Sequence, residues 1–186
     1  MAGARLVEAV LARASADRFR ISMFGDEPYG NYNRILLSGV LAGSQQPEDI
    51  FINPLDWYAE HGVTLHAGVR AAAIDRDARV VRGSDGRVEP YDTLVIATGS
   101  VPFMPPIEGL RAAAAPEPPT GAAADGLLPG VFVFRTLEDC ERMLARAAEA
   151  RRAAVIGGGL LGLEAARGLL ARGLDVEVVH LMEHLM

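Results

Sequence analysis

Residues 155–173, "VIGGGLLGLEAARGLLARG", contain the pattern that decides the fold. Gly157, Gly159 and Gly162 have the spacing G-x-G-x-x-G, and they lie between an apolar strand segment and an amphipathic helix segment. A second apolar segment, "LDVEVVH", follows the helix. In this strand, turn, helix and strand order, the motif predicts a dinucleotide-binding βαβ unit.

Each glycine has a physical role in such a turn. Gly157 permits the tight turn, Gly159 lets a pyrophosphate approach the backbone, and Gly162 lets the helix pack closely on the strand. Leu160 and Leu161 begin the helix, where unpaired N–H groups and the positive end of the helix dipole favour phosphate. We therefore expect these residues to bind NAD(P).

The residue that binds the adenosine ribose is expected about 20 residues further on, at the end of the second strand. His180 occupies this position instead of an acid, while Glu177 lies inside the strand and Glu183 beyond it. An imidazole tolerates a 2′-phosphate that a carboxylate would repel, so NADH and NADPH both remain open and His180 is the ribose candidate. His180 and His184 also have the spacing of a metal pair. Without a third ligand in view, two surface histidines are the better interpretation.

The N-terminal segment repeats this pattern. Residues 3–13, "GARLVEAVLAR", align with residues 162–172, "GLEAARGLLAR", and an apolar strand segment follows each. This echo predicts that Gly3 is the last glycine of a second dinucleotide-binding turn, whose first strand and other glycines would precede Met1. Asp26 and Glu27 follow the strand where a ribose acceptor belongs; ordinary turn acids are the alternative.

Composition excludes several function classes. The 186 residues are 50% hydrophobic and 23% charged, as in a soluble globular protein, and the net charge of −6 argues against nucleic-acid binding. All 18 basic residues are arginines, which excludes lysine Schiff-base chemistry, and Cys140 is the only cysteine, which excludes an internal disulfide. Redox chemistry therefore requires a bound cofactor. Without a signal peptide or an apolar run of ~20 residues, we expect a cytoplasmic location.

Periodicity and turn residues predict the remaining elements. Helices are expected at residues 5–13, 35–41, 55–62, 137–152 and 160–173. Strands are expected at residues 19–24, 63–68, 71–77, 92–99, 153–156 and 174–180, with a hairpin turning at residues 84–86. Residues 111–129 are rich in Ala, Pro and Gly, and this composition predicts a flexible linker.

Four stretches resemble a known family: "FGDEPYGNYNRILLS", "YDTLVIATGSVPFMPPI", "GVFVFRTLEDC" and "VIGGGLLGLEAARGL". They are similar to the FAD- and NAD(P)H-dependent flavoprotein reductases of the pyridine nucleotide-disulfide oxidoreductase type. Within these, the greatest similarity is to the N-terminal part of the large subunit of assimilatory NAD(P)H-dependent nitrite reductases.

The resemblance implies an α/β fold with two Rossmann-like FAD- and NAD(P)-binding domains, both incomplete. Residues 1–110 would form the FAD-binding domain without its first strand. Residues 111–129 would be the linker, and residues 130–186 would form the first half of the NAD(P)H-binding domain.

The resemblance also implies site residues. Those on the FAD side are Gly3, Asp26 or Glu27, Arg34, Val69, Ala97, Thr98 and Gly99. On the NAD(P)H side, Glu164 matches an acid near the nicotinamide; a core-facing or solvated helix acid is the equal alternative. No catalytic side chain and no metal ligand is expected, because hydride passes from nicotinamide to flavin and the protein only positions the two rings.

The function implied is that of an FAD-dependent NAD(P)H oxidoreductase, present as a fragment, which passes electrons to an acceptor or a downstream redox domain. A ferredoxin or rubredoxin reductase and a non-catalytic nucleotide-binding module are the alternatives, and a homodimer is left open. The isolated chain is expected to bind FAD poorly, because half of the phosphate cradle is missing.

Overall fold

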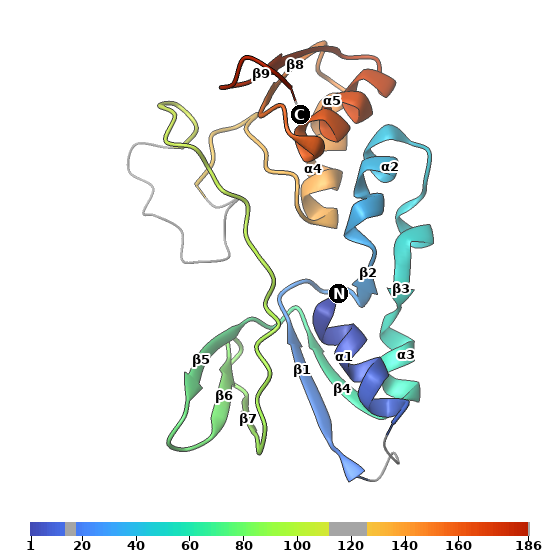
Figure 1. Cartoon of the computed structure of the whole chain (residues 1–186), viewed down its shortest axis with the longest axis vertical. Coiled ribbons are helices and arrows are strands. Elements are labelled where there is room, and N and C mark those ends of the chain that lie inside the picture. The colour runs from blue at the N-terminus through green and yellow to red at the C-terminus, as the bar shows by residue number, and fades with distance from the viewer. Residues whose placement is uncertain (14–17, 112–125, 186) are drawn as a thin grey trace. The chain divides into compact units, whose positions relative to one another are not determined.

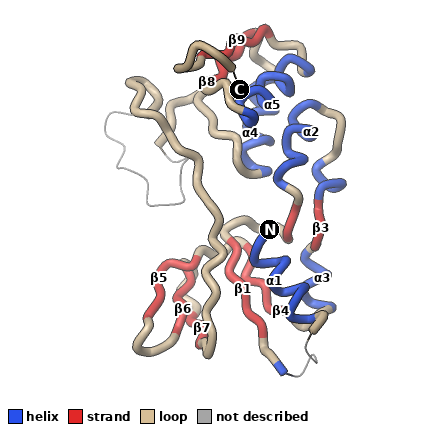
Figure 2. Tube along the Cα trace, viewed as in Figure 1, coloured by secondary structure: helices blue, strands red, loops and turns tan. Residues whose placement is uncertain are grey.

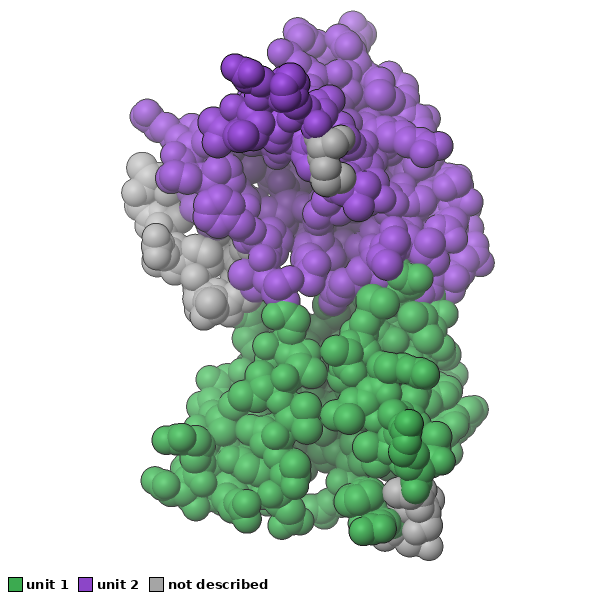
Figure 3. All heavy atoms as spheres, in the orientation of Figure 1, with its two compact units in different colours: residues 1–33, 51–99 green, residues 34–50, 100–186 purple. Residues whose placement is uncertain are grey.

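The computed structural model describes residues 1–13, 18–111 and 126–185. The chain forms two compact units (Figure 3). Unit 1 comprises Met1–Asn33 and Phe51–Gly99, and unit 2 comprises Arg34–Ile50 and Ser100–Met186. This division by packing differs from the functional domains expected from the sequence, whose boundaries therefore stay predictions. Most of the expected linker lies outside the described residues.

Unit 1 is built on a parallel strand pair, β1 (Ile21–Gly25) with β4 (Val63–Ala67), in the register Ile21 to Val63 (Figure 1). The helices α1 (Ala2–Leu11) and α3 (Leu55–Glu60) contribute Val7 and Tyr58 to a core cluster with Val63. The helix and strand expected after Gly3 are therefore both present in this unit, as α1 and β1.

The rest of unit 1 consists of antiparallel strands. The expected hairpin at residues 84–86 is confirmed, because it joins two strands of a three-stranded sheet. The antiparallel strands are β2 (Asn31–Tyr32) with β3 (Phe51–Asn53), and β5 (Ala71–Asp75) with β6 (Val80–Gly83) and β7 (Val88–Pro90).

A partly buried polar network ties α1 to β3. The Nδ2 atom of Asn53 donates to Oε1 of Glu8 at 3.1 Å, and Oδ1 of Asn53 accepts from Nδ2 of Asn31 at 2.9 Å. Hydrogen bonds from Arg5 and from Asn53 lower the pKa of Glu8. The buried amide of Asn53 thus has partners on both sides, which avoids the cost of an unsatisfied buried polar group.

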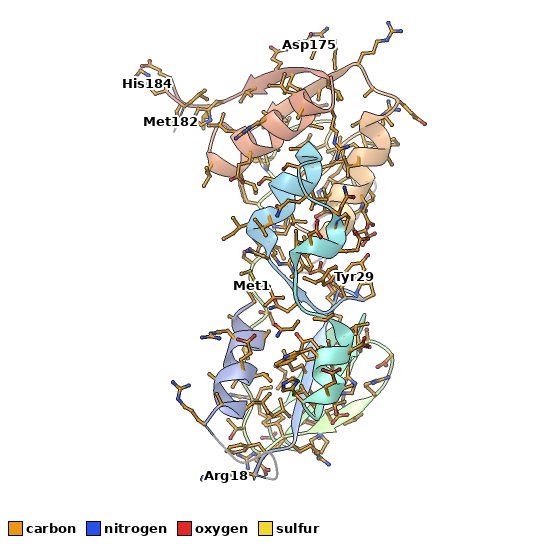
Figure 4. The ribbon with its side chains drawn as sticks, turned by 90° about the vertical axis from the view of Figure 1, so that its right-hand side faces the viewer. Met1, Arg18, Tyr29, Asp175, Met182 and His184 are labelled. Atoms are coloured by element: carbon orange, nitrogen blue, oxygen red, sulfur yellow. The ribbon has the colours of Figure 1, made fainter. Side chains whose placement is uncertain are left out.

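Unit 2 contains the second parallel pair, β8 (Arg152–Ile156) with β9 (Asp175–Val179), joined by α5 (Leu160–Ala171). Figure 4 labels Asp175 at the start of β9 and Met182 and His184 beyond its end. The βαβ unit expected from the glycine motif is therefore confirmed. The other elements are η2 (Arg34–Leu36), α2 (Leu37–Ala42), η3 (Pro47–Ile50) and α4 (Leu137–Ala147).

Helix α2 packs on α4 and α5 within unit 2. Leu41 is fully buried, and a Cβ atom placed on Gly168 of α5 would lie 2.8 Å from Cγ of Leu41. Arg172, just after α5, donates from Nε to the carbonyl of Leu41 at 2.7 Å and from Nη2 to that of Val40 at 2.9 Å. These bonds add a partner to two carbonyl oxygens at the C-terminus of α2, of which that of Val40 also accepts from the N–H of Gly43 at 3.1 Å.

The strand expected at residues 92–99 is not formed. Residues 94–99 have no assigned secondary structure (tan in Figure 2), and Ile96 is 70% exposed. A strand requires a hydrogen-bonded neighbour, and no described segment pairs with these residues. The apolar composition of this segment is therefore not sufficient to form a strand. No helix in the described part of the chain has the length and hydropathy needed to cross a membrane.

Burial determines the chemistry of Cys140 on α4. Its side chain is fully buried, and loss of hydration raises the pKa of its thiol to about 11. Because the thiolate is the reactive form, we expect no labelling of the folded chain by iodoacetamide at neutral pH and labelling of one thiol per chain in denaturant. Mass spectrometry of the labelled protein measures this. Rapid labelling without denaturant would contradict the packing of α4.

Candidate nucleotide-binding site

The glycine turn of unit 2 connects β8 to α5. Gly157 has a φ of 115°, which disfavours any residue with a side chain, and its N–H donates to the carbonyl of Val179 on β9 at 2.8 Å. A Cβ atom on Gly162 would overlap the carbonyl oxygen of Gly157. A Cβ atom on Gly159, in contrast, would have no described atom within 4 Å. Gly157 and Gly162 are therefore required by the conformation and packing of the turn. Gly159 instead leaves open space at the surface of the turn.

The N-terminus of α5 is left open by the described residues. Gly159 is the N-cap and makes no side-chain hydrogen bond, and the first turn contains no acid. Helix α4 differs, because Thr136 and Asp139 form a capping box over its N-terminus. The first N–H groups of a helix have no intrahelical partners, so those of α5 are available to an anion. Leu160 and Leu161, at this end, are 61% and 52% exposed.

His180 lies against the same turn. Its Nδ1 atom accepts a hydrogen bond from the N–H of Gly158 at 3.0 Å, and a Cβ atom on Gly158 would lie 2.9 Å from Cγ of His180. The residue expected to meet the ribose therefore contacts the glycine turn directly. Glu177, in register with Ala154, and Glu183 are both exposed.

A small cavity of about 40 Å³ lies in unit 2 beside the first turns of α5. Its lining includes Glu164 and Arg34, two of the residues expected at the site, and also Arg135, which the sequence analysis missed. Nη1 of Arg34 donates to the carbonyl of Arg135 at 2.9 Å, and Nη2 of Arg135 donates to Oγ of Ser100 at 2.9 Å. In the sequence, the feature that pointed to Arg135 was its position in "GVFVFRTLEDC", one of the stretches that resemble the family. The remaining lining residues are Leu37, Ser38, Phe134 and Leu161.

In unit 1, the acidic candidates lie at the carboxyl ends of β1 and β4. The N–H of Val69 donates to the carbonyl of Gly25, and the N–H of Gly68 donates to that of Glu27, both at 2.9 Å. Asp26 accepts from Nε and Nη2 of Arg70 at 3.2 and 2.8 Å. The structure thus brings Asp26, Glu27 and Val69 together at the edge where parallel strands usually bind their ligands, and the expected contact with a ribose stays a prediction.

The small residues of unit 1 also approach one another. A Cβ atom on Gly3 would lie 3.5 Å from Cβ of Ala97 and 3.5 Å from Cε of Met23, so α1 lies close to the "ATG" segment. Thr98 and Gly99 are exposed, and Gly99 has a φ of 76°. These positions retain backbone that a ligand could approach closely. Arg34 belongs to unit 2 and is not brought together with them inside unit 1.

The described residues contain no group of three or more His, Cys, Asp and Glu side chains arranged to hold a metal ion. They do contain a glycine turn, an open helix N-terminus and, in each unit, the carboxyl ends of a pair of parallel strands. Open space over Gly159 and the uncapped N-terminus of α5 fit the pyrophosphate of a dinucleotide.

Comparison with known proteins agrees with this geometry. Nitrite reductase [NAD(P)H] of Bacillus subtilis is 46% identical over 186 residues, which is 100% of this chain and 21% of that protein. The assimilatory nitrate reductase electron transfer subunit of Bacillus subtilis is 46% identical over 180 residues, 97% of this chain and 21% of that protein. This chain thus spans about a fifth of the length of these relatives.

Among solved structures, a ferredoxin reductase from Rhodopseudomonas palustris is similar with a TM-score of 0.78 and 29% identity, over 97% of this chain and 40% of the other. This similarity confirms the α/β fold class expected from the sequence. The family model described as pyridine nucleotide-disulphide oxidoreductase matches residues 2–186. The chain therefore belongs to the pyridine nucleotide-disulphide oxidoreductase family.

Proposed function

We propose that this chain is the N-terminal, cofactor-binding portion of an FAD-dependent NAD(P)H oxidoreductase of the nitrite-reductase type. The observation that carries the proposal is the open glycine turn at the uncapped N-terminus of α5, in a chain 46% identical over its length to a nitrite reductase. When bound, NAD(P)H supplies a hydride that FAD accepts and passes on as electrons to an acceptor.

The residues of unit 2 would hold the nicotinamide nucleotide. The N–H groups of the first turn of α5, from Leu160 onward, bind the pyrophosphate, and the open space at Gly159 admits it. His180, which contacts the turn at Gly158, would meet the adenosine ribose. Glu164 is half-buried one turn along α5 and lines the cavity with Arg34 and Arg135, so it orients the nicotinamide end.

The residues of unit 1 would hold the flavin nucleotide. Asp26, which is held by Arg70, or Glu27 would accept hydrogen bonds from the ribose hydroxyls, and the backbone at Val69 would meet the adenine. Gly3 and the Ala97, Thr98 and Gly99 segment allow close approach of the flavin nucleotide to the backbone. The electron acceptor is then a downstream redox domain or a separate redox protein, and the cytoplasmic location and the homodimer stay predictions.

A ferredoxin reductase is the second candidate, because a ferredoxin reductase has a similar fold at 29% identity. The electron acceptor distinguishes the two. The longer protein that contains this chain would reduce nitrite with NAD(P)H if the first candidate is right. Reduction of a ferredoxin without reduction of nitrite would favour the second.

Titration of the chain with ADP-ribose tests the nucleotide site without requiring FAD. We expect saturable binding, with backbone amide shifts in NMR concentrated at residues 157–162 and at His180, because the phosphates contact these N–H groups. Binding without shifts at the glycine turn, or no binding by a folded chain, would contradict the proposal. A parallel visible spectrum with added FAD measures flavin binding, which is expected to be weak.

A further inference from the structure

Asp139, in the first turn of α4, is a buried carboxylate that is not among the residues lining the cavity of unit 2. Its Oδ2 atom accepts hydrogen bonds from the backbone N–H of Arg135 at 3.1 Å and from that of Thr136 at 2.9 Å. Its Oδ1 atom accepts from Nη2 of Arg142 at 2.8 Å. One carboxylate therefore holds two successive peptide groups of residues 131–136, a segment that forms neither helix nor strand.

The peptide group between Arg135 and Thr136 connects this carboxylate to Arg34. The group is trans, and in a trans peptide the N–H and C=O bonds point in opposite directions. Its N–H donates to Asp139, so its carbonyl oxygen lies on the other side, where it accepts from Nη1 of Arg34 at 2.9 Å. Hydrogen bonds in a chain polarise one another, and one to a charged group is about twice as strong as a neutral one. Asp139 thus fixes the direction of this carbonyl and strengthens it as an acceptor.

The series of hydrogen bonds ends at Arg34, which lines the cavity of about 40 Å³ together with Glu164. An arginine side chain has many rotamers, and one that is already held in place loses less freedom when a ligand binds. Resting on the proposed function, we infer that Asp139 is a positioning residue. It holds Arg34 at the cavity, so that the nicotinamide end of the dinucleotide meets a guanidinium that is already ordered.

The alternative is that Asp139 only stabilises α4. Asp139 and Thr136 form a capping box, in which the N–H of Asp139 donates to Oγ1 of Thr136 at 3.0 Å. Thr136→Ala removes this hydroxyl and leaves the carboxylate on both backbone N–H groups. It is therefore the matched control, because it weakens the cap of α4 without releasing the peptide group that holds Arg34. Glu138→Gln, at an exposed acid of the same turn, controls for the loss of a charge near the helix N-terminus.

The first measurement follows Arg34 itself in the full 186-residue chain without a ligand. Nitrogen-15 NMR of the arginine side chains reports how fast each guanidinium rotates about its Nε–Cζ bond, and Arg34→Lys assigns the signal. We expect Asp139→Ala to speed this rotation by at least about threefold, the factor that loss of one ordinary hydrogen bond produces. Asp139→Asn keeps an acceptor oxygen without the charge, so its effect is expected to be smaller. Thr136→Ala and Glu138→Gln are expected to leave the rotation unchanged.

The second measurement compares two ligands that share their ADP-ribose part. NADH carries a dihydronicotinamide ring that ADP-ribose lacks, and isothermal titration calorimetry gives both dissociation constants. We expect Asp139→Ala to reduce the preference for NADH by at least about threefold and to keep the constant for ADP-ribose within about twofold. A residue that only stabilised the helix would change the binding of both ligands alike. Thr136→Ala and Glu138→Gln are therefore expected to keep the preference of the parent chain.

The outcomes separate this inference from the proposed function. If Asp139→Ala leaves either the rotation of Arg34 or the preference for NADH unchanged, Asp139 does not position Arg34 for the ligand and only the inference is overturned. An equal change with Thr136→Ala overturns it as well. If the folded parent chain binds neither ligand, the proposed function fails, while the rotation of Arg34 still decides whether Asp139 holds it. Circular dichroism establishes folding, and Asp139→Asn carries both measurements if the Ala variant does not fold.

Discussion

Replacement of Gly162 by valine is expected to abolish nucleotide binding and to destabilise unit 2 by about 3 kcal/mol or more. Any side chain at this position overlaps the carbonyl oxygen of Gly157. Gly157 cannot yield easily, because its φ of 115° and its hydrogen bond to Val179 hold the turn against β9. Urea denaturation and an ADP-ribose titration of the same preparation measure the two losses.

Gly159→Ala is the matched control for this change. Its Cβ atom would meet no described atom within 4 Å, and Gly159 has a φ of −79°, which alanine adopts without strain. We expect it to cost about 1 kcal/mol at most, as an N-cap change, while it weakens binding by filling the space above the turn. Equal loss of stability in both variants would mean that Gly162 is not the close contact between turn and helix.

Replacement of Leu41 by alanine is expected to lower the free energy of unfolding of unit 2 by about 2–5 kcal/mol. Leu41 is fully buried, and it packs on Gly168, where the missing side chain lets α2 approach α5. Removal of the side chain leaves a cavity that the surrounding helices cannot fill without moving. Chemical denaturation followed by circular dichroism measures the loss.

Ile35→Ala supplies the comparison in the adjacent 3₁₀ turn η2. Its side chain is 70% exposed, and exposed substitutions usually change stability by no more than about 0.5 kcal/mol. A small effect of Leu41→Ala, close to that of Ile35→Ala, would show that α2 is not anchored on α5. If both substitutions strongly lowered the free energy of unfolding, the helical segment formed by η2 and α2 would itself be of low stability.

The βαβ unit of unit 2 could be predicted from the sequence because its signals are local. Gly157 has a backbone conformation that other residues rarely adopt, and Gly162 has no room for a Cβ atom. The apolar periodicity of β8, α5 and β9 can be recognised within a few residues of sequence. The expected strand at residues 92–99 is wrong for the opposite reason. Apolar residues there were compatible with a strand, but pairing depends on a neighbour that the segment itself does not specify.

The candidate site was likewise predictable only in part. The positions of His180, Asp26 and Glu27 followed from their distance after a strand. The contact of Arg34 with Arg135, 101 residues apart, had no sequence signal beyond the resemblance. Arg135 was therefore missed, although it shares a cavity with Glu164.

The sequence by itself determined the two glycine-helix-strand segments, the absence of lysine and disulfide chemistry, and the α/β class of the fold. Only the tertiary structure decided that residues 34–50 pack with α4 and α5, and that the ring of His180 accepts the N–H of Gly158. The physical reason is the distance along the chain over which each kind of interaction acts. Turn and helix preferences act between neighbours in the chain, whereas burial and hydrogen bonding between distant residues depend on how the whole chain packs.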